Sequence, residues 1–432
     1  MYETECNKER LILVSTASSF KKMPGRPVQE EKDDDGEFYN PSLKELAQLA
    51  KTAGADIIGQ LTQERPKPHP THYLGKGKVE ELKIYGNAVG ATGILCNDEL
   101  NSAQIKNLNK SLDLKILDRT MIILDIFANR AISAEGKAQV EIAQLKYRLS
   151  RLSGLDAQFS RQGGGTGGLG IGARGPGEKK LETGRRHIKE RIKQLAEELK
   201  EIRAGRAILR EKRIQAGLPV IALVGYTNAG KSTLMNALTS ANVLAEDKLF
   251  ATLDTTTRRL KLPAGTEVLI TDTVGFIDKL PHHLIQAFRA TLEELKYATI
   301  LLHVVDISKS NFRENSIIIY NVLKELHCLD KPIIEVFNKA DIACEECDSN
   351  DIYVSAKTGK NLKNLLSVCE ETLQSISKKA TFIIPYEESH LLNLIHKNCE
   401  ILSKSYEETG TKIEAYVPSK MHFKLLTFFV EI

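Results

Sequence analysis

Short apolar, β-branched runs alternate with amphipathic stretches over the first 130 residues of the chain. The runs that predict strands are Arg10–Val14, Ala55–Leu61, Gly93–Cys96 and Leu114–Leu117. The stretches with a helical pattern include Ser42–Ala53 and Ser102–Asn109. This alternation is typical of an α/β domain with a parallel sheet, which we predict here. The acidic stretch Lys21–Pro41 has almost no apolar residues, and we expect a mobile loop there.

From about Glu135 the apolar residues recur at three- and four-residue steps, as on one face of a helix. A first stripe is formed by Ile142, Leu145, Leu149 and Leu152. A second is formed by Ile188, Ile192, Leu195, Leu199 and Ile202, and Leu209 resumes it. Two such stripes bury each other only if their helices pair. The pattern therefore predicts an antiparallel helical hairpin that resembles a short coiled coil.

The segment between the two predicted helices is rich in glycine over residues 161–177 and cannot form a stable helix. Residues 161–213 contain fifteen Lys and Arg against seven Asp and Glu, a balance of +8, whereas the whole chain carries only +4. A solvated helical face with a flexible connector is one interpretation. The basic, glycine-rich connector favours the other interpretation, an arm that enters a polyanion such as a nucleic acid.

The next strand pattern, Pro219–Val224, leads into a phosphate-binding motif and a helix pattern at Thr233–Leu238. The motif GxxxxGK[ST] is formed by Gly225, Tyr226, Thr227, Asn228, Ala229, Gly230, Lys231 and Ser232. Its glycines let backbone N–H groups surround the β-phosphate of a nucleotide at a helix N-terminus. We expect Lys231 to neutralise the β- and γ-phosphate oxygens, and Ser232 can ligate Mg²⁺.

A second phosphate-binding element follows the strand pattern Thr266–Ile270 and consists of Asp272, Thr273, Val274 and Gly275. The aspartate can hold Mg²⁺ through a water molecule, and the N–H of Gly275 can meet the γ-phosphate. Phe276 follows where Ras has the glutamine that orients the attacking water, so basal hydrolysis should be slow. A backbone group, an element of a binding partner or a monovalent cation must then assist. Asn228 is a candidate ligand for K⁺, although a loop-shaping role fits its position equally well.

The base-reading element follows the strand pattern Lys331–Phe337 and consists of Asn338, Lys339, Ala340 and Asp341. The Asp341 carboxylate matches the N1–H and 2-amino groups of guanine, and adenine has no 2-amino group to satisfy it. GTP is therefore favoured over ATP. After the strand pattern Asp351–Val354 come Ser355, Ala356 and Lys357, which in GTPases place a backbone N–H at the guanine O6.

The stretch Phe250–Arg259 lies between the phosphate-binding loop and Asp272, the natural place for a switch segment whose threonine meets Mg²⁺ and the γ-phosphate. The candidates are Thr252, Thr255, Thr256 and Thr257, and the sequence does not choose among them. All the other nucleotide elements follow predicted parallel strands, and open α/β sheets bind ligands at the carboxyl ends of such strands.

The length of 432 residues predicts about three domains. Seven scattered cysteines, an odd number, and the lack of an apolar leader indicate reduced thiols in a cytoplasmic protein. Cys344 and Cys347 form a lone CxxC without further ligands nearby, which we interpret as an ordinary loop. Apolar runs such as Ile300–Val305 are far shorter than the ~20 residues that span a bilayer, so no membrane span is expected.

The chain closely resembles the HflX family of GTPases over nearly its whole length. The matching stretches are Tyr73–Leu82, Asp118–Thr120, Leu124–Phe127, Glu135–Glu141, Arg174–Glu178 and Leu181–Thr183. The resemblance implies a GTPase domain of the TRAFAC class and binding to the large ribosomal subunit and its rRNA, with splitting or rescue of ribosomes under stress. It also implies that the magnesium ligand is the threonine of the motif Phe250, Ala251, Thr252, Leu253 and Asp254.

The sequence thus predicts an α/β protein with four parts: an N-terminal α/β domain (1–134), a helical hairpin (135–216), a P-loop GTPase domain (217–378) and a small C-terminal α/β domain (379–432). We expect a monomer in which Lys231, Thr252 and Gly275 are catalytic and Ser232 and Thr252 hold Mg²⁺. GTP and GDP are the expected ligands. The alternative is a non-catalytic RNA-binding scaffold with a structural guanine nucleotide, which would show no ribosome-stimulated turnover. A role in RNA modification is disfavoured because no modification active site is evident.

Overall fold

The computed structural model describes residues 8–17, 41–162, 176–215, 218–239, 249–250, 252–277, 292, 294–342, 351–376, 378–417 and 428–431. The chain forms two compact units, and their boundary falls between Leu199 and Lys200, apart from residues 280–287. Four segments for which the sequence makes predictions lie outside the described residues. They are residues 21–40, residues 163–175, Ala251, and the pair Cys344 and Cys347.

The first unit begins with a four-stranded sheet in the order β2-β1-β3-β4, and every pair of neighbours is parallel, as predicted. The strands are β1 (Arg10–Ala17), β2 (Asp56–Glu64), β3 (Gly93–Cys96) and β4 (Lys115–Asp118). The helices are α1 (Pro41–Thr52), α2 (Lys76–Val89), α3 (Ser102–Leu112) and α4 (Arg119–Arg130). The sequence patterns missed α2 and α4. Helix α4 is apolar on nearly every side because most of it is buried, and it therefore lacks the clean periodicity of a surface helix.

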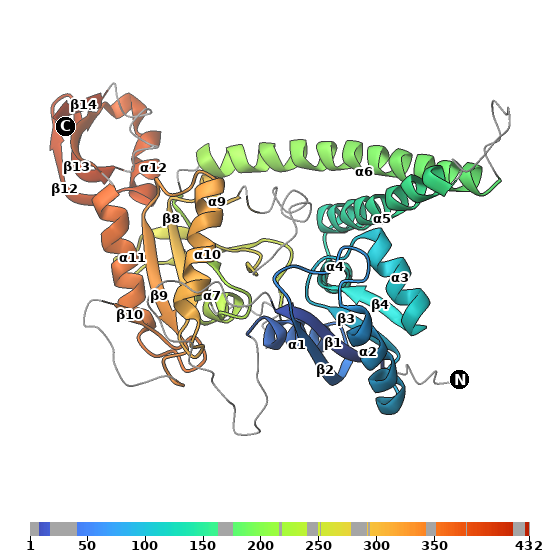
Figure 1. Cartoon of the computed structure of the whole chain (residues 1–432). Coiled ribbons are helices and arrows are strands. Elements are labelled where there is room, and N and C mark those ends of the chain that lie inside the picture. Colours follow the sequence, from blue (N-terminus) through green and yellow to red (C-terminus); the bar gives the residue numbers. More distant parts are fainter. Residues whose placement is uncertain are drawn as a thin grey trace, which may run out of the picture. The chain divides into compact units, whose positions relative to one another are not determined.

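Two long helices, α5 (Ala134–Gln162) and α6 (Pro176–Gln215), form the predicted hairpin and run side by side in opposite directions (Figure 1). Their contact is a small apolar cluster of Ala138, Ile142, Leu145, Ile192, Leu195 and Leu199. An exposed ion pair between Arg191 and Glu141, with Nε and Oε1 2.8 Å apart, also joins the two helices. Five of these six residues, all except Ala138, belong to the two predicted stripes.

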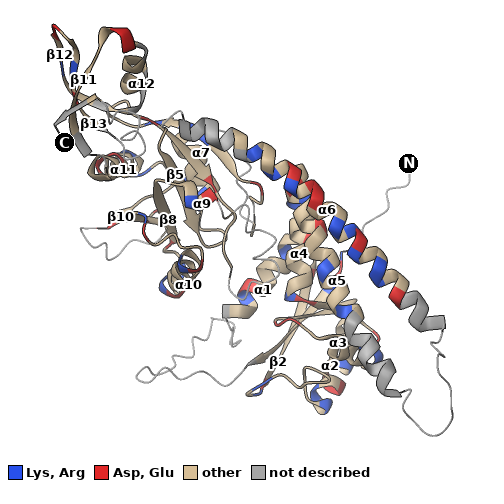
Figure 2. Cartoon of the chain, turned by 90° about the horizontal axis from the view of Figure 1, so that it is seen from above, with Lys and Arg blue, Asp and Glu red and all other residues tan. Residues whose placement is uncertain are grey.

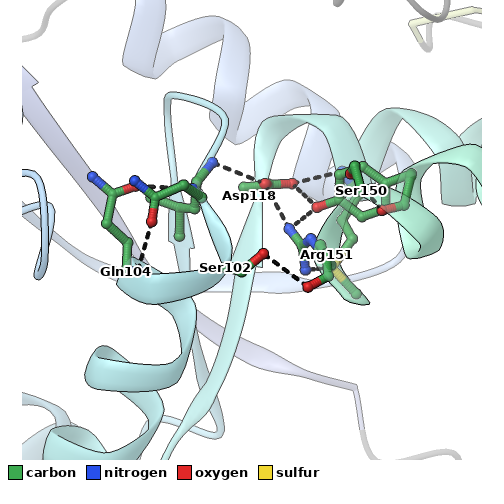
Figure 3. A network of polar contacts seen from close by, with 9 residues as sticks. Ser102, Gln104, Asp118, Ser150 and Arg151 are labelled. Carbon is green, nitrogen blue, oxygen red and sulfur yellow. Dashed lines mark hydrogen bonds and ion pairs between the residues drawn. The ribbon is translucent and has the colours of Figure 1, made fainter. Parts of the chain in front are cut away.

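Asp118 fastens α5 to the end of the first sheet (Figure 3). Its carboxylate is fully buried, and each of its two oxygens accepts two hydrogen bonds. Oδ1 accepts from the Met121 N–H at 2.9 Å and the Tyr147 hydroxyl at 2.6 Å. Oδ2 accepts from the Leu100 N–H at 3.1 Å and from Nη2 of Arg151 at 2.7 Å. Because Tyr147 and Arg151 belong to α5, one carboxylate fixes this helix on the strand end.

The second unit contains a six-stranded sheet in the order β10-β9-β8-β5-β7-β6. Its strands are β5 (Val220–Gly225), β6 (Thr256–Lys261), β7 (Glu267–Asp272), β8 (Ile300–Asp306), β9 (Ile333–Asn338) and β10 (Ile352–Tyr353). Its helices are α7 (Lys231–Thr239), α9 (Glu294–Tyr297), α10 (Phe312–Glu325) and α11 (Leu362–Ile376). All strand pairs are parallel except β6 with β7. Because β6 is the last strand in this order, residues 256–259, the final part of the predicted switch segment, lie in an edge strand.

The chain ends in a four-stranded antiparallel sheet with the order β12-β13-β11-β14. The strands are β11 (Lys378–Ile384), β12 (Glu400–Glu407), β13 (Gly410–Val417) and β14 (Phe429–Glu431), with a short 3₁₀ turn η1 (Tyr386–Glu388) and helix α12 (His390–Asn398). Phe382, Ile395 and Ile413 form the centre of its core. Among the described residues, no helix is both long and apolar enough to cross a bilayer.

Candidate functional site

The phosphate-binding loop joins β5 to α7, as the strand-loop-helix pattern predicts. Gly230 has φ +90°, and a Cβ at this position would lie 2.2 Å from Nδ2 of Asn338. Asn228 also has a positive φ, +62°. The left-handed backbone and the close approach of Asn338 explain why a glycine occupies position 230. The loop therefore closes tightly around the start of α7.

Lys231 is 6 % exposed, and its ammonium group donates to two loop carbonyls, Gly225 O at 3.1 Å and Tyr226 O at 2.8 Å. Burial lowers the pKa of Lys231 to about 8, while the nearby Asp272 carboxylate acts in the opposite direction. The buried Lys231 ammonium bonds to two neutral carbonyls and lies near one carboxylate, so it is suited to bind a further anion.

Ser232, Thr252 and Asp272 come together from three separate segments of the second unit. The Ser232 hydroxyl donates to Oδ2 of Asp272 at 2.6 Å, and the Thr252 hydroxyl donates to the same oxygen at 3.0 Å. The two hydroxyl oxygens are themselves 2.6 Å apart. Burial raises the pKa of Asp272, and the Lys231 ammonium and the two hydroxyl groups oppose this shift. Among the described residues, Thr252 is the candidate threonine whose hydroxyl meets Ser232 and Asp272. Thr256 and Thr257 belong to β6, and the Thr257 hydroxyl pairs with that of Thr271 at 3.1 Å.

The oxygen atoms of this cluster fit a divalent cation. Oδ1 of Asp272 is buried and has no hydrogen-bond partner among the residues that the structure describes. A buried carboxylate oxygen without a donor is unfavourable unless a cation or water completes its surroundings. Hydroxyl and carboxylate oxygens are the donors that Mg²⁺ prefers.

Asn338 connects the phosphate-binding loop to the loop after β10. Its Nδ2 donates to the Ala229 carbonyl at 2.8 Å, and its Oδ1 accepts from the Ala356 N–H at 3.0 Å. Asp341 is exposed on the same edge of the sheet, and a hydrogen bond from the Ser355 hydroxyl is the main cause that lowers its pKa. An exposed carboxylate that is fully ionised at neutral pH is available to accept hydrogen bonds from a ligand.

Several predicted site residues have buried side chains with local roles. Phe250, Leu253 and Val274 are each less than a tenth exposed. The Thr273 hydroxyl donates to the Leu223 carbonyl at 2.6 Å within the sheet. These residues can meet a nucleotide only through their backbone.

Asp306 belongs to the site region but was not predicted from the sequence. It is the last residue of β8, as Asp272 is the last residue of β7. Its Oδ2 lies 2.8 Å from Nζ of Lys339, which has a left-handed φ of +67°. An acidic residue directly after six buried strand positions was the signal that could have revealed it.

Three family models match the chain in succession. They are described as "GTP-binding GTPase N-terminal" at residues 40–128, "GTP-binding GTPase Middle Region" at residues 130–213 and "50S ribosome-binding GTPase" at residues 220–339.

Two similar proteins agree with these matches. The GTPase HflX of Lacrimispora saccharolytica is 48 % identical over 424 residues, which cover 97 % of this chain and 96 % of the relative. The GTPase HflX of Escherichia coli is 40 % identical over 378 residues, covering 85 % and 88 %. A GTP-binding protein from Sulfolobus solfataricus in complex with GDP is similar with a TM-score of 0.42 and 23 % identity, covering 85 % of this chain and all of that one. The chain is therefore a GTP-binding, GTP-hydrolysing enzyme and belongs to the HflX family of GTPases.

Proposed function

We propose that this GTPase acts on the large ribosomal subunit in the cytoplasm, where it splits or rescues stalled ribosomes. The observation that supports this most directly is the long helix α6, whose charged side chains between Glu182 and Arg206 are mostly exposed. Figure 2 shows basic and acidic positions interleaved along the coloured part of this helix. The local excess of positive charge over residues 161–213 makes the hairpin suitable for contact with rRNA phosphates. The matched GTPase-domain family is described as ribosome-binding.

The nucleotide site follows from the same proposal. Lys231 binds the β- and γ-phosphates, and the backbone N–H groups of the loop, from Gly225 to Ser232, surround them. Ser232 and Thr252 hold Mg²⁺, with Asp272 behind them, and the ion supplies charge neutralisation at the phosphates when it is bound. The Gly275 N–H meets the γ-phosphate, and Asp341 reads guanine. The bound nucleotide is thereby oriented by residues that follow β5, β7 and β9 and by Thr252, which precedes β6.

Phe276 explains why a partner would stimulate turnover. Its backbone is fastened to the phosphate-binding loop, because its N–H donates to Gly225 O at 3.1 Å and its carbonyl accepts from the Thr227 N–H at 2.7 Å. Its side chain is 8 % exposed and has no polar atom. It cannot orient a water molecule, so basal hydrolysis should be slow. We infer that ribosomal contact, or K⁺ held near Asn228, assists the reaction.

Replacing Asp341 with asparagine should weaken GTP binding by about 30-fold to 1000-fold, because two charge-assisted hydrogen bonds to guanine are lost. The amide can donate to O2 of xanthine, so affinity for the xanthine nucleotide should rise. Equilibrium titration with labelled GDP and XDP measures both changes. Asp330→Asn, at another exposed position of the second unit, is the matched control. Unchanged affinity for GDP in Asp341→Asn would remove the assigned base-reading role.

Reversing two exposed charges of α6, with Arg186→Glu and Lys193→Glu together, should weaken binding to the large subunit. Each lost phosphate contact should lower the slope of log affinity against log salt by roughly one. The control is Lys83→Glu with Lys110→Glu, which makes the same charge change at exposed positions of the first sheet's helices. Sedimentation with separated subunits at several salt concentrations measures binding. If both pairs behave alike, net charge rather than the hairpin determines the association.

A further inference from the structure

We propose that the hydroxyl group of Thr227 orients the water molecule that attacks the γ-phosphate, in place of the glutamine that this chain lacks after Gly275. The proposal rests on the nucleotide site described above and assigns one further catalytic residue to it. Thr227 is the third residue of the phosphate-binding loop, and the motif GxxxxGK[ST] makes no demand on this position.

The first observation is that the Thr227 hydroxyl is buried without a partner. The residue is 1 % exposed, and its Oγ1 has no hydrogen-bond partner within the described ranges. Buried polar atoms in folded proteins nearly always have a partner, and those without one are often at functional sites. The Thr227 hydroxyl would fit this tendency if its hydrogen-bond partner is the water molecule that enters with the nucleotide.

The second observation is the position of Thr227 beside the groups that meet the γ-phosphate. A Cβ added to Gly275 would lie 2.9 Å from Cα and 3.0 Å from Cγ2 of Thr227. The same Cβ would lie 3.0 Å from Nζ of Lys231. The Thr227 Cα and methyl group and the Lys231 ammonium therefore lie directly against the Gly275 backbone. In the proposed site the γ-phosphate adjoins Gly275 and Lys231, so Thr227 lies beside it.

The third observation is that the backbone holds Thr227 rigidly against the segment after Asp272. The Thr227 N–H donates to Phe276 O at 2.7 Å, and residues 226 and 276 form an isolated parallel bridge. The side chain of Phe276 has no polar atom, whereas Thr227, whose N–H is bonded to the Phe276 carbonyl, carries a hydroxyl group. A hydroxyl on a fixed backbone is oriented before the substrate binds, which favours catalysis.

The reaction remains ordinary GTP hydrolysis. The water oxygen forms a bond to the γ-phosphorus while the bond from the γ-phosphorus to the bridging oxygen breaks, and GDP leaves with that electron pair. The proton of the water passes to the phosphate that is released. Thr227 takes no proton: its Oγ1 accepts a hydrogen bond from the water and thereby directs the water lone pair toward phosphorus.

A competing explanation is that the hydroxyl serves the structure. Thr227 also lines a small cavity with Tyr226, His303, Asp306, Lys309 and Phe312. A water molecule in this cavity could be the missing partner of the hydroxyl. In that case removing the hydroxyl would change the stability of the second unit and leave the chemical step unaffected.

The test compares Thr227→Val, which keeps the shape without the hydroxyl, with Thr227→Ser, which keeps the hydroxyl. We expect Thr227→Val to slow single-turnover hydrolysis of GTP without ribosomes by about tenfold, the effect of one lost hydrogen bond in the transition state. Thr227→Ser should stay within about threefold of the parent rate, and GDP affinity should change by less than about twofold in both variants.

Three results would overturn the proposal. They are a parent-like rate for Thr227→Val, an equal loss in Thr227→Ser and Thr227→Val, or a loss of GDP affinity that matches the loss of rate. Lys231→Ala, measured in parallel, separates this proposal from the site on which it rests. If Lys231→Ala hydrolyses GTP normally, the assigned nucleotide site is wrong. If Lys231→Ala is inactive and Thr227→Val is normal, only the role of Thr227 is wrong.

Discussion

Lys231→Ala is expected to abolish GTP turnover and most of the preference for triphosphate over diphosphate. The lysine ammonium is buried and its two hydrogen bonds go to loop carbonyls, so the variant removes a positive charge that the loop itself holds in place. Loss of one group that stabilises transition-state charge lowers the rate by on the order of 10²–10³. Single-turnover hydrolysis, together with titrations of GTP and GDP, measures the two effects.

Lys261→Ala, at an exposed position of β6, is the matched lysine control and should behave like the parent. Ser232→Ala should reproduce the behaviour of the parent protein without Mg²⁺. The parent offers a second check, because burial lowers the pKa of Lys231 to about 8. Above this pH the nucleotide must bind together with a proton, so affinity should fall as pH rises, by up to about tenfold per unit. Magnesium-dependent hydrolysis that survives in both Lys231→Ala and Ser232→Ala would place the catalytic site elsewhere.

Asp118→Asn is expected to destabilise the first unit by about 2–5 kcal/mol. Each carboxylate oxygen accepts two hydrogen bonds, so an NH₂ group in place of either oxygen faces two donors. Those donors lie in a buried site, and they would lose their acceptor without gaining water. Burial raises the pKa of Asp118 while the Arg151 guanidinium opposes this shift, so the loss includes the ion pair with Arg151 as well as the hydrogen bonds.

Urea unfolding of the full chain measures this effect. GDP stabilises only the part of the chain that binds it, so the transition that saturating GDP does not shift reports the first unit. Asp113→Asn is the matched control, since Asp113 is exposed and its φ of +53° is one that asparagine adopts readily. A midpoint in Asp118→Asn equal to that of Asp113→Asn would show that the four-bond network does not stabilise the unit.

Regular strands and local motifs were predictable because their signals lie within a few neighbouring residues. The predicted strand Gly93–Cys96 is β3, and the predicted hairpin stripes meet in the core of α5 and α6. The order of the nucleotide motifs was readable for the same reason, since each follows a short buried strand. Helix α4 was missed because burial on several faces removes the periodicity that marks a surface helix. Helix α2 buries only Val79, Leu82 and Gly86, and a stripe with so few apolar residues is a weak signal.

The sequence by itself determined the α/β class, the family and the identity of the nucleotide motifs, because composition, period and spacing are properties of neighbouring residues. The tertiary structure decided which threonine of the switch segment lies with Ser232 and Asp272, and it paired Asp306 with Lys339. It also decided that Asp118 holds α5 and that the Thr227 hydroxyl is buried without a partner. The reason is that these contacts join residues 20 or more positions apart. Such contacts depend on how separate strands and helices pack, which no local pattern encodes.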